Sequence, residues 1–271
     1  MAGIIHFIQI SHTLEWEQLR MKVISLNVGG IKQAVEKGFL DWLKDQDADV
    51  VCVQDVRTKS WKLGDAIERP EGWEGYFFDA EQDDFSGTGI YCRKTPKAVM
   101  TGLGFELADR EGRFMQADFE KVSVASFLMP SGANPAEKKL FLEQFLEFLT
   151  KLRRKRREFI ICGTWNIAHK TIDLANWQDN QLSIGFRPEE RAWMDQVFGP
   201  LSFIDAFREV NRDTDQFTFW PNPKLERQRQ EGWRLDYQVV GPNLRKNIKD
   251  AWIDRSVNFS DHAPIIVEYD L

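Results

Sequence analysis

The 271-residue chain has only three cysteines, no long apolar run and no excess of basic charge. Cys52, Cys92 and Cys162 lie in short apolar runs without CxxC spacing. This argues against a disulfide framework or a thiolate metal site, and favours a reducing compartment such as the cytoplasm. No run approaches the roughly 18 apolar residues of a membrane-spanning helix. The net charge of −6 argues against strong, non-specific binding to bare nucleic acid.

The first twenty residues lack the basic start and the small-residue cleavage site of a signal peptide. A strand-like pattern begins directly after Met21. We therefore expect residues 1–20 to be a loosely ordered N-terminal extension, and residues 21–271 to form a single domain.

Short apolar runs alternate with amphipathic stretches along the chain. The runs predicted to be β-strands are 23–27, 49–54, 89–92, 114–119, 122–128, 159–162, 217–220, 235–240 and 265–269. Apolar residues at helical spacing predict helices over 31–44 and 135–152, and a further helix that begins with Pro188. A strand–helix–strand start followed by many strands predicts a layered α/β domain with mixed sheets. Periodicity alone does not separate this architecture from a doubly wound fold.

Polar side chains stand at or just past the ends of several predicted strands. They are Asn27, Asp55, Asn166, Asp236, Asp261 and His262. Strand ends that face one side are where α/β proteins build their sites, and oxygen-rich ligands suit a hard cation such as Mg²⁺. Each residue taken alone has an ordinary explanation, because an asparagine after a strand is commonly a turn residue.

The order of the motifs is more specific than any single residue. SLNVGG, QD, RxxQADF, CGTWNIAH, GWRLDYQ and SDHAP follow one another along the chain, with IDLANW, GFRPEERAW and EGR between them. This set resembles the exonuclease III family of abasic-site endonucleases, in the endonuclease/exonuclease/phosphatase superfamily, from about Met21 to Leu271. The resemblance implies a four-layer α/β sandwich, with two mixed sheets face to face and helices outside. It also implies a phosphodiesterase that uses Mg²⁺ or Mn²⁺.

The resemblance places three residues on the metal side of the site. Asn27 matches an active-site asparagine, Asp55 matches the metal-binding glutamate and Asp261 belongs to the closing Asp-His pair. Asp55 is one methylene shorter than the family's glutamate, and Gly29 replaces the usual second asparagine. We therefore expect weak Mg²⁺ binding at best, because such sites rest on one or two well-placed carboxylates.

The resemblance also assigns the phosphate side of the site. Asn166 matches the asparagine that holds the scissile phosphate, and His262 matches the histidine that contacts it. Asp236 matches the aspartate that orients this histidine, as a carboxylate fixes an imidazole tautomer.

The catalytic centre departs most from the family pattern. The family reads GDxN where this chain reads Gly163-Thr164-Trp165-Asn166, so that Thr164 replaces the catalytic aspartate. A threonine hydroxyl cannot take a proton from water near neutral pH, and general base catalysis is worth ~10²–10⁴ in rate. Leu128 replaces the family's tyrosine near the phosphate, and Ser131 replaces the neighbouring asparagine. Five departures in one site predict impaired catalysis.

Four further motifs resemble one branch of this family. QDxR, LxPSG, the RRKRRE run and DQFxxWP are similar to the catabolite repression control protein (Crc) branch, which keeps the nuclease fold. This resemblance implies a regulator that represses translation in a complex with the RNA chaperone Hfq and mRNA. In this role no cofactor is required. The net charge of −6 predicts weak or no binding to bare nucleic acid, and the lack of a long apolar run predicts no membrane partner.

Two alternatives remain open. Asn166 and Asp261 survive, which favours a working Mg²⁺-dependent abasic-site endonuclease or 3′-exonuclease. A phosphatase of the wider superfamily, acting on a small substrate, is the third interpretation.

A basic run follows the predicted helix 135–152. It contains six basic residues in the seven positions from Lys151 to Arg157. One interpretation is a solvated helix end, because cations near a helix C-terminus oppose the macrodipole. Six crowded cations repel one another, which favours an anionic partner instead. The residues predicted to contact RNA held by the partner complex are Arg153, Arg154, Lys155, Arg156 and Arg157.

Overall fold

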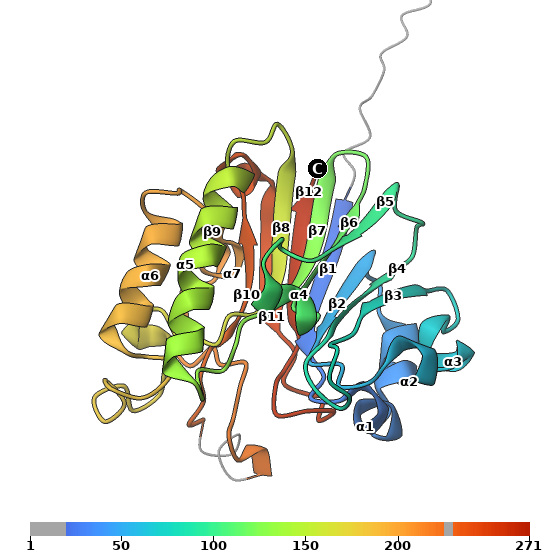
Figure 1. Cartoon of the computed structure of the whole chain (residues 1–271), viewed down its shortest axis with the longest axis horizontal. Helices are drawn as coiled ribbons and strands as arrows, with labels where there is room; N and C mark the ends of the chain where they lie inside the picture. Colours follow the sequence, from blue (N-terminus) through green and yellow to red (C-terminus); the bar gives the residue numbers. More distant parts are fainter. Residues whose placement is uncertain (1–19, 225–229) are drawn as a thin grey trace, which may run out of the picture.

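The computed structural model describes residues 20–224 and 230–271 (Figure 1). Its sheets have central strands that are apolar on both faces and edge strands that are partly exposed. One sheet contains β1 (Arg20–Asn27), β2 (Val50–Gln54), β3 (Glu74–Phe78), β4 (Thr88–Cys92), β11 (Ile248–Ile253) and β12 (Ile265–Asp270). The other contains β5 (Ala98–Thr101), β6 (Phe114–Asp118), β7 (Val122–Leu128), β8 (Glu158–Thr164), β9 (Ile204–Asp205) and β10 (Asp236–Val240).

The strand orders are β11-β12-β1-β2-β4-β3 and β5-β6-β7-β8-β10-β9. Each sheet has one central parallel pair, β1 with β2 and β7 with β8. The other described strand pairings are antiparallel. The carboxyl ends of both parallel pairs therefore meet the amino ends of their antiparallel neighbours.

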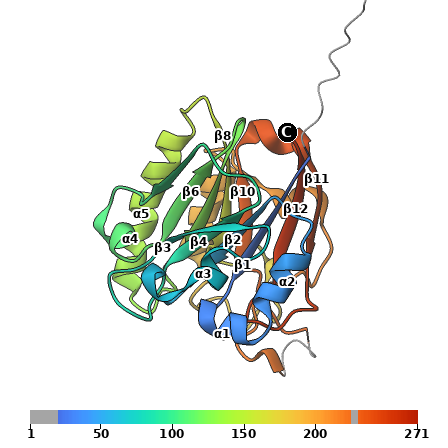
Figure 2. The same cartoon turned by 90° about the vertical axis from the view of Figure 1, so that its right-hand side faces the viewer.

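Helices cover the two outer faces. The α-helices are α1 (Ile31–Glu36), α2 (Phe39–Asp45), α3 (Asp65–Glu68), α4 (Glu106–Arg110), α5 (Pro135–Leu152), α6 (Pro188–Phe198) and α7 (Ala206–Val210). Short 3₁₀ turns are η1 (Ser60–Lys62), η2 (Thr171–Asp173) and η3 (Pro242–Asn247). In Figures 1 and 2, α5 and α6 flank one sheet while α1, α2 and α3 flank the other. This confirms the predicted four-layer α/β sandwich.

Three apolar layers hold the sandwich together. All three cysteines lie buried as free thiols in the layer between the sheets. The second sheet packs against α5 and α6 through aromatic rings, of which Phe127 and Phe145 stack with centroids 4.3 Å apart. The first sheet packs against α1 and α2 around the fully buried Phe39. Burial on both faces explains why the central strands read as continuous apolar runs.

Three predictions about local structure were wrong. The single helix over 31–44 is two helices, because Gly38 takes a φ of +94° and the chain turns there. Residues 217–220 do not form a strand, since Phe219 makes only isolated bridges and two prolines that cannot donate to a ladder follow it. Arg20 belongs to β1 rather than to the extension, because it pairs with Asp270. The expectation for residues 1–19 lies outside the described residues.

No described helix is long and apolar enough to cross a membrane.

Candidate phosphodiester site

Four buried side chains form one continuous hydrogen-bonded chain where the carboxyl ends of β1 and β8 meet. The Asn27 amide nitrogen donates to Thr164 Oγ1 at 3.1 Å. The Thr164 hydroxyl in turn donates to Asp236 Oδ1 at 2.6 Å. Asp236 Oδ2 lies 2.7 Å from His262 Nδ1. Because a carboxylate only accepts, Nδ1 carries the proton and Nε2 is the ring nitrogen that points away from Asp236.

The register of the second sheet positions Thr164. Thr164 pairs with Asp236 across the antiparallel β8–β10 ladder and with Leu128 across the parallel β7–β8 ladder. The residue before it must be glycine, because a Cβ on Gly163 would lie 1.8 Å from the carbonyl oxygen of Phe127. The tight approach of β7 and β8 thus fixes where the Thr164 hydroxyl points.

The loop before β12 positions His262 beside Asp236. Ser260 Oγ donates to the carbonyl of Asn27 at 2.6 Å and accepts from the His262 amide at 2.9 Å. The Phe219 ring lies 4.7 Å from the imidazole ring. These contacts join the last strand of the chain to the first, so the four polar groups assemble only in the complete fold.

Asn166 lies beside this chain but turns its amide toward the backbone. Its φ is +52°, and its Nδ2 donates to the carbonyl of Met129 at 2.6 Å. Lys138 donates to the Asn166 carbonyl at 3.0 Å and forms an ion pair of 2.5 Å with Glu190. Both charged side chains are nearly fully buried, and desolvation lowers the pKa of Lys138 although Glu190 opposes this. The pair ties α5 and α6 to the loop that carries Asn166.

The two carboxylates expected on the metal side have different surroundings. Asp55 Oδ2 is paired with Arg57 Nη2 at 2.6 Å. Asp261 is exposed, and its backbone carbonyl accepts from the Trp220 amide. Asn27 Oδ1 already accepts from the Gly29 amide at 3.0 Å. Within residues 20–224 and 230–271, no group of three His, Cys, Asp or Glu side chains is placed to hold a metal ion. Asp55 is paired with Arg57 and Asn27 with the Gly29 amide, so neither side chain is free to bind Mg²⁺ as it stands.

Leu128 closes the site on the side of β7. Its side chain is buried beside Thr164, and its carbonyl accepts from Arg113 Nη1 at 3.1 Å. Burial lowers the pKa of Arg113, which also pairs with Glu111. A leucine here presents no hydroxyl to a phosphate oxygen, so this wall of the site is apolar.

A second buried ion network holds the segment just before β10, the strand that begins with Asp236. Arg234 lies between Asp173 Oδ1 at 2.8 Å and Asp205 Oδ2 at 2.7 Å. Arg208 also contacts Asp173, at 2.9 Å. Burial by itself raises the pKa of Asp173, but the two guanidinium groups outweigh it and bring the value to about 2. The network fixes the segment just before β10 and therefore the carboxylate that orients His262.

These supporting residues were not predicted from the sequence. Lys138 and Glu190 stand 52 positions apart, and Asp173 and Arg234 stand 61 apart. No local pattern connects such partners. The match of IDLANW and GFRPEERAW to the family is the one signal that could have pointed to Asp173 and Glu190.

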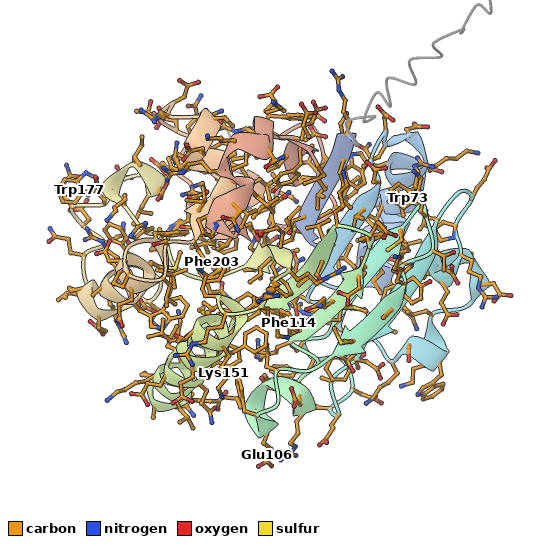
Figure 3. All side chains as sticks on the ribbon, turned by 90° about the horizontal axis from the view of Figure 1, so that it is seen from above. Trp73, Glu106, Phe114, Lys151, Trp177 and Phe203 are labelled. Atoms are coloured by element: carbon orange, nitrogen blue, oxygen red, sulfur yellow. The ribbon has the colours of Figure 1, made fainter. Side chains whose placement is uncertain are left out.

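The basic run lies far from the polar chain. It precedes β8 whereas Thr164 ends β8, so the two are separated by roughly 20 Å at 3.3 Å per residue. Lys151 lies on the outer helix α5 (Figure 3). Arg153 donates to the carbonyl of Leu201 at 2.8 Å, and Arg157 donates to the carbonyl of Val122 at 3.1 Å. Arg154, Lys155 and Arg156 are exposed. The run is therefore divided between structural and exposed cations.

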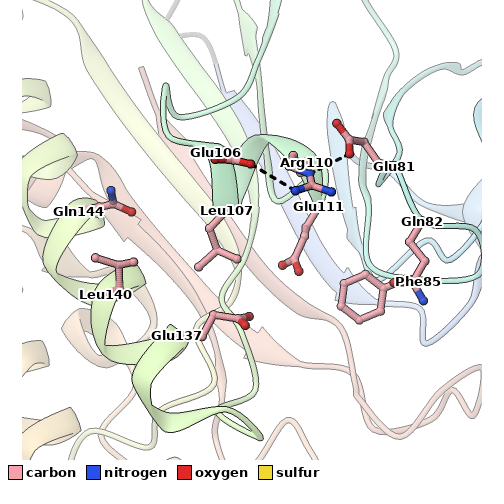
Figure 4. Close-up of a pocket in the computed structure, with 10 residues that line it drawn as sticks. All are labelled: Glu81, Gln82, Phe85, Glu106, Leu107, Arg110, Glu111, Glu137, Leu140 and Gln144. Atoms are coloured by element: carbon pink, nitrogen blue, oxygen red, sulfur yellow. Dashed lines mark hydrogen bonds and ion pairs between the residues drawn. The ribbon is translucent and has the colours of Figure 1, made fainter.

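An acidic cavity of about 490 Å³ is lined in part by Glu111, the ion-pair partner of Arg113 (Figure 4). The charged residues that line it are Glu81, Glu106, Arg110, Glu111 and Glu137. Arg110 pairs with Glu81 at 2.8 Å and with Glu106 at 3.2 Å. Four glutamates and one arginine line the cavity, so its lining is predominantly acidic.

A sequence profile of the Endonuclease/Exonuclease/phosphatase family matches residues 24–262, nearly the whole described chain. The chain belongs to this family. It is 34% identical over 251 residues to an exodeoxyribonuclease of Bacillus subtilis (strain 168), covering 90% of this chain and 98% of that protein. It is 33% identical over 263 residues to a DNA-(apurinic or apyrimidinic site) endonuclease of Dictyostelium discoideum, covering 94% and 72% of the two chains.

Solved structures share the fold. The structure of an AP endonuclease from Archaeoglobus fulgidus superposes with a TM-score of 0.85 at 24% identity, covering 93% of this chain and all of that one. Within the Endonuclease/Exonuclease/phosphatase family, this chain thus has the sheets and the overall layout of an exonuclease III-like nuclease. Its distinctive feature is the threonine at the centre of the hydrogen-bonded chain.

Proposed function

We propose that this protein keeps the phosphodiester-binding site of an exonuclease III-like nuclease but hydrolyses phosphodiesters poorly. The observation that carries the proposal is the role of Thr164, whose hydroxyl donates to Asp236 at 2.6 Å and accepts from Asn27 at 3.1 Å. A hydroxyl in this position orients its neighbours, but it cannot accept a proton from water near pH 7.

The remaining groups support binding and orientation. Asp236 holds His262 in one tautomer, with Nε2 directed away from the carboxylate. Leu128 withholds the hydrogen bond that the family's tyrosine would give to a phosphate. Loss of a general base typically lowers the rate by ~10²–10⁴, and the lost tyrosine donor adds to that loss.

More specifically, we propose that the protein acts as a post-transcriptional regulator of catabolite repression, in a complex with Hfq and mRNA. The motifs QDxR, LxPSG, RRKRRE and DQFxxWP support this role. The net charge of −6 supports weak or no binding to bare nucleic acid and recruitment by a partner that already holds RNA. In this role the protein requires no cofactor and works in the cytoplasm.

A second candidate is a working abasic-site endonuclease or 3′-exonuclease that requires Mg²⁺ or Mn²⁺. The relatives support it more directly than the regulatory role, because those described above are named for nuclease activity. Asn27, Asn166, Asp236 and His262 also match the family's pattern. The geometry at Thr164 and Asp55 weighs against it.

The experiment that separates the candidates is cleavage of a synthetic abasic-site duplex in Mg²⁺ and in Mn²⁺. The protein is purified free of host nucleases and compared with an intact exodeoxyribonuclease. We expect a rate at least about a thousandfold lower, as the loss of a general base and a phosphate donor requires. Tight binding of the isolated protein to RNA at physiological salt would count against the partner-dependent role.

A further inference from the structure

The turn after β2 holds two non-glycine residues in the left-handed region. Asp55 has a φ of +59° and Arg57 a φ of +52°. The backbone is held there by bonds from the Val56 amide to the Gly87 carbonyl at 3.2 Å and from the Arg57 amide to the Ser86 carbonyl at 2.7 Å. Such backbone is uncommon and persists where the surroundings determine it. Its consequence is that the Arg57 side chain folds back onto the Asp55 carboxylate.

This turn lies at the same edge of the sheet as the polar chain. The Gly30 amide donates to the Asp55 carbonyl at 2.8 Å, directly after the strand that ends in Asn27. A Cβ on Gly30 would lie 3.9 Å from Arg57 Cδ. The stem of Arg57 therefore passes along the turn between β1 and α1, at the carboxyl ends of both central strands.

The Asp55–Arg57 pair is a neutral ion pair in which a guanidinium occupies the carboxylate. Arg57 Nη2 lies 2.6 Å from Asp55 Oδ2, and 49% of the arginine side chain is exposed against 17% of the aspartate. One of its five N–H donors serves Asp55, and the others have no partner among the described residues. A planar guanidinium suits the oxygens of a phosphodiester.

We propose that the Arg57 guanidinium takes the place of a divalent cation at Asp55, so that the site binds a nucleic-acid phosphate without metal. This inference rests on the proposed function in one respect, which is that a phosphodiester is the ligand. A metal ion at Asp55 would have to displace a guanidinium of the same sign of charge.

The first test measures Mn²⁺ binding by electron paramagnetic resonance, with MnCl₂ alone as the probe. The proteins are wild type, Arg57→Gln, and Arg156→Gln as a matched control that removes the same charge at the far end of β8. We expect Arg57→Gln to bind Mn²⁺ about tenfold or more tightly than the other two, because a like charge in contact with the site is gone. Adding Asp55→Asn to Arg57→Gln should abolish the gain. Equal Mn²⁺ affinity in wild type and Arg57→Gln would overturn the inference.

The second test uses dimethyl phosphate, the smallest phosphodiester, and follows arginine Nε–H resonances by nuclear magnetic resonance. In the presence of EDTA, the Arg57 signal should shift in a saturable way, and Mg²⁺ should not strengthen the binding. A shift that requires Mg²⁺, or no shift at all, would refute metal-free phosphate binding. The outcome is separable from the proposed function: rapid cleavage of abasic DNA would refute impaired catalysis, whereas only these two titrations decide the role of Arg57.

Discussion

Replacing Thr164 with aspartate would restore the family's residue but would place a second carboxylate against Asp236. The two side chains pair across β8 and β10, and each residue is only 1% exposed. Two carboxylates about 4 Å apart repel by ~4 kcal/mol at an effective dielectric constant of 20. Loss of the hydroxyl donor to Asp236 adds about 1 kcal/mol. Thr164→Asp should therefore destabilise the fold at neutral pH by roughly 3–5 kcal/mol, unless one carboxyl keeps a proton.

The destabilisation of Thr164→Asp should depend on pH. Repulsion raises the folded-state pKa of the carboxyl pair above its unfolded value, which is near 4. The native state then binds more protons than the unfolded state between these two pKa values. Stability of Thr164→Asp should consequently be greatest below pH 4 relative to wild type and fall as the pH rises.

Thermal melting at pH 5 and pH 8 measures the effect, with Thr164→Asn as the neutral control of matched size. At roughly 2–4 °C per kcal/mol, Thr164→Asp should melt about 10 °C below the control at pH 8. At pH 5 the difference in melting temperature between Thr164→Asp and Thr164→Asn should be smaller. Cleavage should recover little, because Leu128 and Asp55 remain. A variant as stable as the control at both pH values would refute the close contact of residues 164 and 236.

Other substitutions test the charged groups around the site and the basic run. Lys138→Met leaves Glu190 buried without its partner and should cost about 3–5 kcal/mol in urea denaturation, while adding Glu190→Gln should recover most of this. The low pKa of Asp173, about 2, contributes about 2 kcal/mol that is present above pH 4 and lost as the pH falls toward 2. Asp173→Asn should therefore flatten the acid side of the stability–pH curve, and an unchanged curve would contradict the assigned pKa. Arg154→Glu with Arg156→Glu should leave melting unchanged but abolish salt-sensitive assembly with Hfq and mRNA; unchanged assembly would leave the run as a solvated helix end.

The central strands were predictable from the sequence and the edge strands were not. β1, β2, β7 and β8 are buried on both faces, and this makes each a continuous apolar run. The strands without a prediction, β3, β5, β9 and β11, are the four sheet edges. Their partly exposed residues give no clear pattern, since one face and one edge contact solvent.

The candidate site was predictable in part because most of its residues lie at the ends of the central strands. Asn27, Thr164 and Asp236 end or begin central strands, and His262 lies in the loop before β12. The structure joins these four residues in one hydrogen-bonded chain. The sequence did not show that Asp55 pairs with Arg57, because that contact depends on two left-handed residues in one turn. Nor did the sequence show that Asp261 lies exposed in the loop before β12.

The most direct test of impaired chemistry is a single-turnover measurement on an abasic-site duplex with the protein in large excess. Excess protein removes weak binding as a cause of slow turnover, so the observed rate reports the chemical step. With Thr164 in place of a general base, the rate in Mg²⁺ or Mn²⁺ should be at least about a thousandfold below that of an intact exodeoxyribonuclease under the same conditions. A single-turnover rate equal to that of the intact enzyme would show that this site performs catalysis without a carboxylate at residue 164, and would contradict the account.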